Sequence, residues 1–372
     1  MALDWDDILS YNTVKVVRIR DRRLGILHIT FMASIVIYIV IYSIILNKGY
    51  LNLETPVGSI RASLLKPSQS QTNFPYCSNQ ANPNPNILPL KCEYWDESNV
   101  VYPIGEETAF CATTRVKYYN QTADCEFTSP TCTYKDSDNA QNIYVADIER
   151  FTLLIDHTMY APVSGIQRNA LSLHGYIQDE NNKEIQVNQG INTIGVQGKP
   201  DIIELGLLLN YTGINLDNPS LINPNLTMRY DGLIILVFID YSNTYSNSIK
   251  NIKYTYSTSV VQDTEFTVVE PVVLDNINHR FVFKRHGIRM LFFQTGSIGH
   301  FKFQSLLLTF VSGMGLLAIS TLIVDQLAIR ILPQRKSYQS FKFQVTEGYN
   351  PMKKIVKDDR GDELLYHKIE SL

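Results

Sequence analysis

The chain has 372 residues, a net charge of −3 and 45% hydrophobic residues. This balance fits a globular domain combined with membrane spans and excludes a nucleic-acid-binding protein. Two uncharged apolar stretches, 24–46 and 303–324, bracket a more polar segment of over two hundred residues. At about 1.5 Å rise per residue, each gives roughly 33–35 Å of helix, which crosses the ~30 Å hydrocarbon core of a bilayer. Two spans place both chain ends on one side, which excludes most soluble enzymes and favours a receptor, a channel or a membrane-tethered ectoenzyme.

Basic residues flank the two stretches mainly on one side. They precede the first and follow the second, as Lys15, Arg18, Arg20, Arg22, Arg23, Arg330, Arg335, Lys336 and Lys342. The positive-inside rule therefore predicts a cytoplasmic N-terminal tail (1–23), an extracellular or lumenal domain (47–302) and a cytoplasmic C-terminal tail (325–372). A cleaved signal peptide is excluded because the first stretch is too long and no small-residue cleavage site follows it. A buried core helix would need the same exception at both ends.

The distribution of cysteines indicates that the middle domain lies in an oxidising compartment. All five cysteines lie in its first part, as Cys77, Cys92, Cys111, Cys125 and Cys132. An odd number allows at most two bridges within one chain and leaves one thiol over. No spacing resembles a zinc site, so no metal is expected. Three glycosylation acceptors, Asn120, Asn210 and Asn225, also lie in this domain.

The middle domain is predicted to be rich in β-strands. Apolar and β-branched runs occur at 151–155, 233–239 and 253–261. Two further runs, 281–283 and 290–293, are separated by a predicted turn at Gly287. Short strands with turn signals between them indicate a β-sheet domain.

The second apolar stretch differs in composition from the first. It contains Thr309, Ser312, Gly313, Gly315, Ala318, Ser320 and Thr321, whereas the first is bulky and β-branched. Small and hydroxyl residues allow close helix contact and can face water. One helical face carries Leu308, Ser312, Gly315 and Ile319. This face either lines a pore or packs against another helix. Asp325 ends this stretch. It is either a functional-site residue at the membrane edge, or it forms a salt bridge or a helix cap near the headgroups.

Seven short motifs in register give the chain a family resemblance. They are Tyr11-Asn-Thr13-Val-Lys15, Lys48-Gly49-Tyr50, Glu149-Arg-Phe151-Thr152, Asp231-Gly232, Lys284-Arg-His-Gly287-Ile288-Arg289, Ser312-Gly313 with Asp325, and Tyr338-Gln-Ser-Phe-Lys342. Together with the two spans they resemble the ionotropic purinoceptors, the ATP-gated cation channels. The resemblance implies a homotrimer with two transmembrane helices per subunit flanking a β-rich ligand-binding domain. ATP, as agonist and not as cofactor, would bind between subunits, and the second spans would line a pore for Na, K and Ca ions.

The resemblance also implies a ligand site. Lys284 matches the family lysine that grips phosphate, and Thr152 matches the threonine that contacts adenine. Lys66 is the nearest candidate for a paired Lys-x-Lys, whose second lysine is missing here. Arg280, in Asn278-His279-Arg280, stands much nearer Lys284 than the arginine of the family's Asn-Phe-Arg motif. The family's usual ten cysteines are reduced to five.

Two other function classes share this topology. A nucleotide-hydrolysing ectoenzyme would need a phosphate-binding loop and a nearby carboxylate pair, and neither is found. A two-span scavenger or lipid-transfer receptor has no need of a second span rich in small residues. We therefore predict a channel and not an enzyme, in the plasma membrane or in an internal membrane such as that of a contractile vacuole.

Overall fold

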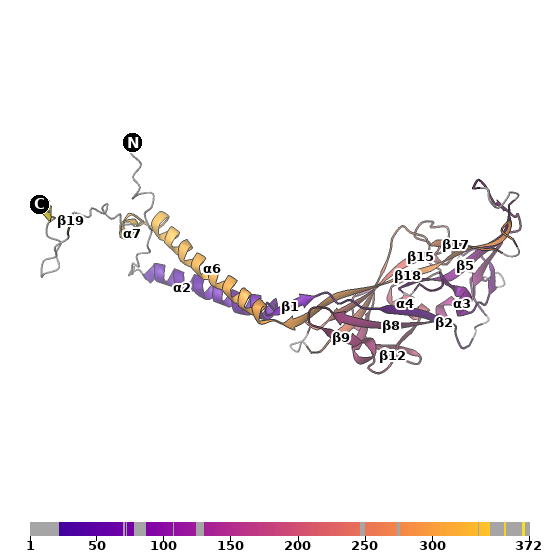
Figure 1. Cartoon of the computed structure of the whole chain (residues 1–372), viewed down its shortest axis with the longest axis horizontal. Coiled ribbons are helices and arrows are strands. Elements are labelled where there is room, and N and C mark those ends of the chain that lie inside the picture. Colours follow the sequence, from indigo (N-terminus) through magenta and orange to yellow (C-terminus); the bar gives the residue numbers. More distant parts are fainter. Residues whose placement is uncertain are drawn as a thin grey trace. The chain divides into compact units, whose positions relative to one another are not determined.

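The computed structural model describes residues 22–69, 71, 73–77, 87–106, 108–123, 130–245, 250–273, 276–333, 335–342, 353–354 and 367–368. The chain folds as two units. One contains Met1–Tyr50 with Lys302–Leu372, and the other is Leu51–Phe301. Figure 1 shows helices in the first unit and mainly strands in the second.

The first unit contains the two apolar helices. The α-helix α2 (Arg22–Ile37) continues as the π-helix η1 (Tyr38–Leu46), and α6 runs from Phe303 to Arg330. Both are long and apolar enough to cross a membrane. The prediction of two apolar helices flanking a β-rich domain is thus confirmed. Asp325 lies inside α6 and not at its end, because a charge ends an apolar stretch without ending a helix. The short elements that follow are α7 (Arg335–Lys342), β19 (Lys353–Lys354) and β20 (His367–Lys368).

Small residues hold α6 close to α2 and η1. A Cβ added to Gly313 would lie 2.7 Å from Cδ1 of Ile39, so any larger residue there would require the Ile39 side chain to move. The Thr309 hydroxyl donates to the Gly49 carbonyl at 2.9 Å. Close approach through small and hydroxyl side chains is the usual means by which helices associate in lipid.

The second unit is built on a twelve-stranded sheet. Its path is β11 (Glu184–Ile185), β10 (His174–Gln178), β16 (Lys253–Val260), β15 (Leu233–Ser242), β18 (His279–Phe301), β5 (Ala109–Thr122), β7 (Gln141–Val145) and β3 (Lys91–Glu93). Off this path, β1 (Leu51–Glu54) and β17 (Thr267–Val273) pair with β18, while β4 (Val101–Tyr102) and β6 (Lys135–Asp136) pair with β5. The long strand β18 therefore contacts four others.

A six-stranded sheet packs beside the first. Its path is β12 (Val187–Gln189), β13 (Asn192–Ile194), β14 (Asp201–Glu204), β8 (Thr152–Ala161) and β2 (Ile60–Leu65), with β9 (Ile166–Asn169) on β8. The short helices of the unit are α3 (Glu97–Val100), η2 (Ile148–Arg150), η3 (Ala170–Ser172), α4 (Leu205–Tyr211) and α5 (Met228–Asp231). One hydrophobic core joins side chains of both sheets, such as Leu153 and Val237.

The predicted strands are confirmed, but the predicted turn at Gly287 is wrong. β18 runs straight through this residue, and its register with β5 shifts between His286 and Gly287. A Cβ at Gly287 would lie 2.2 Å from the carbonyl oxygen of Ala112 on β5. The glycine therefore permits a β-bulge with close backbone approach, which is the other common reason for a glycine within a strand.

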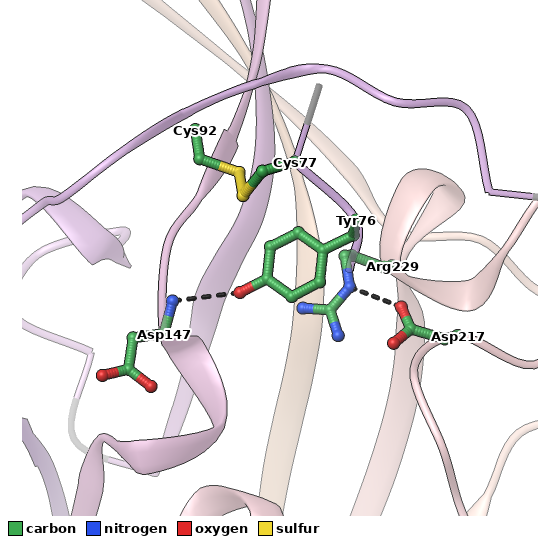
Figure 2. The surroundings of a disulfide bond; sticks show 6 residues. All are labelled: Tyr76, Cys77, Cys92, Asp147, Asp217 and Arg229. Carbon is green, nitrogen blue, oxygen red and sulfur yellow. Dashed lines mark hydrogen bonds and ion pairs between the residues drawn. A yellow bond between two sulfur atoms is a disulfide. The ribbon is translucent and has the colours of Figure 1, made fainter. Parts of the chain in front are cut away.

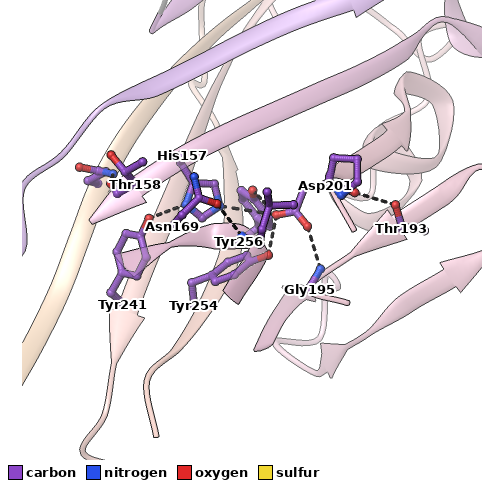
Figure 3. Close-up of polar contacts among 12 residues, drawn as sticks. His157, Thr158, Asn169, Thr193, Gly195, Asp201, Tyr241, Tyr254 and Tyr256 are labelled. Carbon is purple, nitrogen blue, oxygen red and sulfur yellow. Dashed lines mark hydrogen bonds and ion pairs between the residues drawn. The ribbon is translucent and has the colours of Figure 1, made fainter. Parts of the chain in front are cut away.

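A buried polar cluster connects the two sheets (Figure 3). Asp201 of β14 accepts hydrogen bonds from the hydroxyls of Tyr254 and Tyr256 on β16, at 2.7 and 2.8 Å, and from the Gly195 amide at 2.8 Å. His157 of β8 bonds the Tyr241 hydroxyl through Nδ1, and its Nε2 lies 3.5 Å from Asp201 Oδ2. Burial raises the pKa of Tyr254 and Tyr256 above the ordinary value, so both hydroxyls stay protonated and donate.

Replacing Asp201 by leucine should destabilise the folded domain strongly. The change removes the acceptor for three buried donors, and each unpaired buried group costs about 1–3 kcal/mol. A loss of about 3 kcal/mol lowers the melting temperature of a domain this large by roughly 6–12 °C. Thermal unfolding of purified protein in detergent measures this. Asp156→Leu on the exposed side of β8 is the matched control, and equal melting of the two variants would contradict the role given to Asp201.

Candidate functional site

The structure brings Lys66 and Thr152 together. Leu65, the last residue of β2, lies opposite Thr152, the first residue of β8. Lys66 follows directly and is exposed, whereas Thr152 is buried. Within the described part of the chain, no ion pair or hydrogen bond engages the Lys66 ammonium group. The end of β2 therefore presents a cation beside the start of β8.

Lys284 lies on the other sheet. It is half-buried on β18, opposite Lys117 of β5 on one side and Val269 of β17 on the other. Among the described residues it has no carboxylate partner. Two other cations of β18 have such partners. Arg285 binds Glu270 at 2.7 Å, and Arg289 binds both oxygens of Glu106 at 2.7 Å. Lys284 is thus available to an external anion.

Sequence reasoning missed Lys117. The sequence pattern that could have pointed to it is the alternation of Arg115 and Lys117, which puts two cations on one face of an apolar strand. The sequence contains no indication that this face adjoins Lys284, because β5 and β18 lie far apart along the chain.

Arg280 lies four residues before Lys284 on β18. Its Nε donates to Oε1 of Gln121 at 2.7 Å, and its guanidinium group lies 3.4 Å from the centre of the Tyr134 ring. These contacts hold the side chain in place and leave its charge without a carboxylate partner among the described residues.

The surroundings of Lys284 are electrically positive. The pKa of the neighbouring His286 is lowered to about 3 by burial, then by the charges of Arg115 and Lys284. The imidazole is therefore neutral at physiological pH. Burial disfavours a charge of either sign, so only the contributions of Arg115 and Lys284 indicate a positive environment here.

Arg229 connects the regions of the two sheets that carry these lysines. Its guanidinium group is 1% exposed, binds Asp217 at 2.7 Å and Glu149, and lies 3.8 Å from the centre of the Tyr76 ring (Figure 2). Burial opposes the charge, but the two carboxylates outweigh burial and raise the pKa of Arg229. Glu149 is three residues before Thr152, so this ion pair fixes the chain that leads into β8.

The next residue along, Tyr230, completes the connection to β5. Its carbonyl accepts from Nε of Arg115 at 2.6 Å, and the Arg115 guanidinium group lies 3.7 Å from the centre of its ring. Arg115 is two residues before Lys117. A continuous series of contacts therefore joins the Thr152 region to the Lys117–Lys284 pair.

A disulfide stabilises this region. Cys77 is bonded to Cys92, and Tyr76 beside it accepts a hydrogen bond from the Asp147 amide at 3.1 Å (Figure 2). Cys132 is also disulfide-bonded, and Cys125 lies outside the described residues. Cys111 is free and fully buried, and burial raises the pKa of its thiol to about 12. The predicted leftover thiol is therefore Cys111, and it stays protonated at neutral pH.

The residues expected to line a pore share one face of α6. Leu308 is 69% exposed, Ile319 is exposed, and a Cβ on Gly315 would meet nothing within 4 Å. The Ser312 hydroxyl donates to the Leu308 carbonyl at 2.7 Å. The helix turns a different side to α2 and η1, where Gly313 packs. Plain packing within one subunit therefore does not account for the predicted face.

The remaining predicted residues are distributed as follows. Asn120 lies on β5, Asn210 at the end of α4 and Asn225 in the loop before α5, and all three are exposed. Tyr338 and Lys342 lie in α7. Tyr11, Thr13 and Lys15 lie outside the described residues.

Comparison with known proteins agrees with this arrangement. The family model described as ATP P2X receptor matches residues 9–142 and 105–345. P2X receptor B and P2X receptor C of Dictyostelium discoideum are 56% and 57% identical to the chain, each over 100% of both sequences. A crystal structure of a P2X receptor from the Gulf Coast tick, determined in the presence of ATP and Zn²⁺, has the same fold with a TM-score of 0.58. The two sequences are 15% identical, and the match covers 81% of this chain and 99% of the tick receptor chain.

The matches extend over both helices and the β-rich domain, and they include the segments that carry Thr152 and Lys284. The chain belongs to the P2X receptor family of ATP-gated cation channels.

Proposed function

We propose that three copies of this chain form a cation channel that opens when ATP binds between neighbouring subunits. The observation that carries the proposal is Lys284, a cation without a carboxylate partner among the described residues, on the strand that leads into α6 through Lys302 alone. Family membership supports the ligand and the assembly. Lys66, Lys284 and Arg280 bind the phosphates, and Thr152 contacts the adenine.

Elementary electrostatics explains why several cations are needed. A triphosphate carries three to four negative charges and loses hydration when it enters a partly shielded cleft. At an effective dielectric constant of ~20, one lysine 4 Å from a charge contributes about 4 kcal/mol of Coulomb energy before the cost of desolvation. One lysine cannot replace the hydration of the whole polyphosphate. Convergence of cations from β2 and β18 is therefore required.

Gating requires that ATP bind the open trimer more tightly than the closed one. Closure of two subunits around the polyphosphate pulls β18, and α6 follows because only Lys302 separates strand from helix. The three α6 helices then splay. An apolar constriction at Leu308 and Ser312 widens and fills with water, which admits Na, K and Ca ions.

The membrane placement follows from the same topology. Residues 24–46 and 303–324 cross the bilayer, and both tails are cytoplasmic. Asp325 then lies at the cytoplasmic edge of the pore. The ligand-binding domain faces the exterior or the lumen of an internal compartment such as a contractile vacuole, and its exposed Asn120, Asn210 and Asn225 carry glycans.

Replacing Lys284 by alanine should shift ATP activation to at least tenfold higher concentration, because one charge-assisted phosphate contact contributes about 1.5–3 kcal/mol. The measurement is the current evoked by ATP applied to the domain side of a lipid membrane that contains purified protein. Lys66→Ala should act in the same direction. Lys199→Ala, an exposed lysine in the turn before β14, is the control. An unchanged dose–response curve for Lys284→Ala would exclude this lysine from the site.

The purified protein should contain three copies of the chain. A homotrimer is the assembly in which three α6 helices surround one axial pathway. Mass photometry in mild detergent, or crosslinking before solubilisation, counts the subunits. A stable monomer or dimer would overturn the trimer and the gating mechanism that depends on it.

Ser312→Cys should react with a water-soluble thiol reagent faster in ATP than without it, and the current should then fall. The wild-type channel serves as background, since Cys111 is buried and protonated. Leu317→Cys, on the half-buried side of α6, should react slowly. If Leu317→Cys blocks the current while Ser312→Cys is inert, α6 is rotated by about 100–140° from the proposed pore face.

A further inference from the structure

Two lysines stand directly opposite each other in the twelve-stranded sheet. The antiparallel register pairs Lys117 of β5 with Lys284 of β18. Opposed residues in such a pair have Cβ atoms about 4.5–5.5 Å apart and project from the same face, where like charges destabilise the sheet. The fold alone gives no reason for this arrangement. A repulsive pair of this kind is explained when an anion bridges the two charges.

The strands on either side do not neutralise the pair. Across from Lys117 on β7 is Asn142, and across from Lys284 on β17 is Val269, which is 51% exposed. In the part of the chain that the structure describes, neither lysine forms an ion pair. Elsewhere in the same sheet, Lys253 of β16 binds Glu184 at 2.6 Å. The Lys117–Lys284 pair thus differs from Lys253, Arg285 and Arg289 of the same sheet, each of which forms an ion pair.

The same face continues with further positive groups. Arg115 precedes Lys117 on β5, and Arg280 precedes Lys284 on β18. Carboxylates near this row are Asp136 of β6, which lies opposite Gln121 and accepts from its amide at 2.6 Å, and Asp231 and Glu265, whose charges act on Arg115. Gln121 is four residues from Lys117, about 13 Å along the strand. Asp136 therefore flanks the Arg280 end of the row and does not separate the two lysines.

Two adjacent ammonium groups that form no ion pair with any described residue fit one class of ligand well. Neighbouring anionic groups on one molecule, as in a phosphoanhydride chain, can bind both lysines at once and relieve their repulsion. The family's paired Lys-x-Lys keeps only Lys66 in this chain. A second lysine beside Lys284 restores the number of cations that the missing one would supply.

We propose that Lys117 contacts the polyphosphate of ATP and forms with Lys284 a two-lysine clamp. The inference rests on the proposed function, since it names a further residue of the same site. Lys117 is a binding residue whose charge, and not its packing, is required.

The first test compares Lys117→Ala, Lys117→Arg and Lys199→Ala for displacement of a labelled ATP by ATP and by AMP. We expect Lys117→Ala to weaken ATP binding at least tenfold and AMP binding less than twofold, because AMP lacks the anhydride phosphates. Lys117→Arg should stay within about threefold of wild type, and Lys199→Ala should be unchanged. A structural defect would weaken both nucleotides equally and would overturn the proposal.

Charge reversal separates binding from folding. Lys117→Glu places opposite charges across β5 and β18, and such pairs stabilise a sheet. We expect a melting temperature equal to or above that of wild type, with ATP binding weakened more than a hundredfold. Retained ATP affinity in this variant would overturn the proposal.

The outcomes distinguish this inference from the proposed function. If Lys284→Ala weakens ATP binding while Lys117→Ala matches wild type, the clamp is overturned and the ATP site stands. If ATP binds without evoking current, gating fails, while the displacement series still decides the role of Lys117. If the wild-type protein binds no ATP, both proposals fall.

Discussion

One uninterrupted strand constrains the whole molecule. β18 runs from His279 to Phe301, is hydrogen-bonded along its length to β5, β17, β15 and β1, and is followed after Lys302 by α6. Lys284 and Phe301 are seventeen residues apart (301 − 284), or roughly 55 Å along a strand. An extended strand that is bonded to at least one neighbour along this stretch scarcely lengthens, so in the proposed mechanism a pull near Lys284 is transmitted to Lys302. Since Leu51 of β1 pairs with Phe301, the connection to the first helix receives the same displacement.

Buried polar groups fix the elements that surround this strand. The Asp201 cluster joins β14 and β8 to β15 and β16, and Arg229 joins the chain before β8 to the chain beside β5. Removing one partner of a buried ion pair is strongly destabilising, because a charge is then left without compensation. Local rearrangement of the ligand-binding strands is therefore costly. The proposed gating mechanism therefore places the movement between subunits.

Hydropathy and alternation were sufficient to predict the two helices and most strands, because both patterns are local. Gly287 was misassigned because a glycine indicates a turn and a bulge equally well, and only the approach of Ala112 on β5 decides between them. Lys117 could not be placed, because its partner Lys284 is 167 positions away (284 − 117) and the register depends on that same bulge. Sequence reasoning proposed cations for the site by type and resemblance, and this assignment stays a prediction. Which of them lie together is a property of the sheet.

The position of the two lysines limits what each can do in gating. Lys117 and Lys284 belong to one hydrogen-bonded strand pair, so we expect the spacing of their backbones to be the same in the closed and the open channel. Contacts that are equal in two states add affinity and shift no equilibrium. The preference of ATP for the open trimer must then come from groups that move relative to this pair. The two sheets of one subunit are joined by the Asp201 cluster, so we expect the contacts that favour opening to lie across the boundary between subunits. In the proposed mechanism the clamp holds the polyphosphate in place, and closure of the neighbouring subunit upon the bound nucleotide supplies the force on β18.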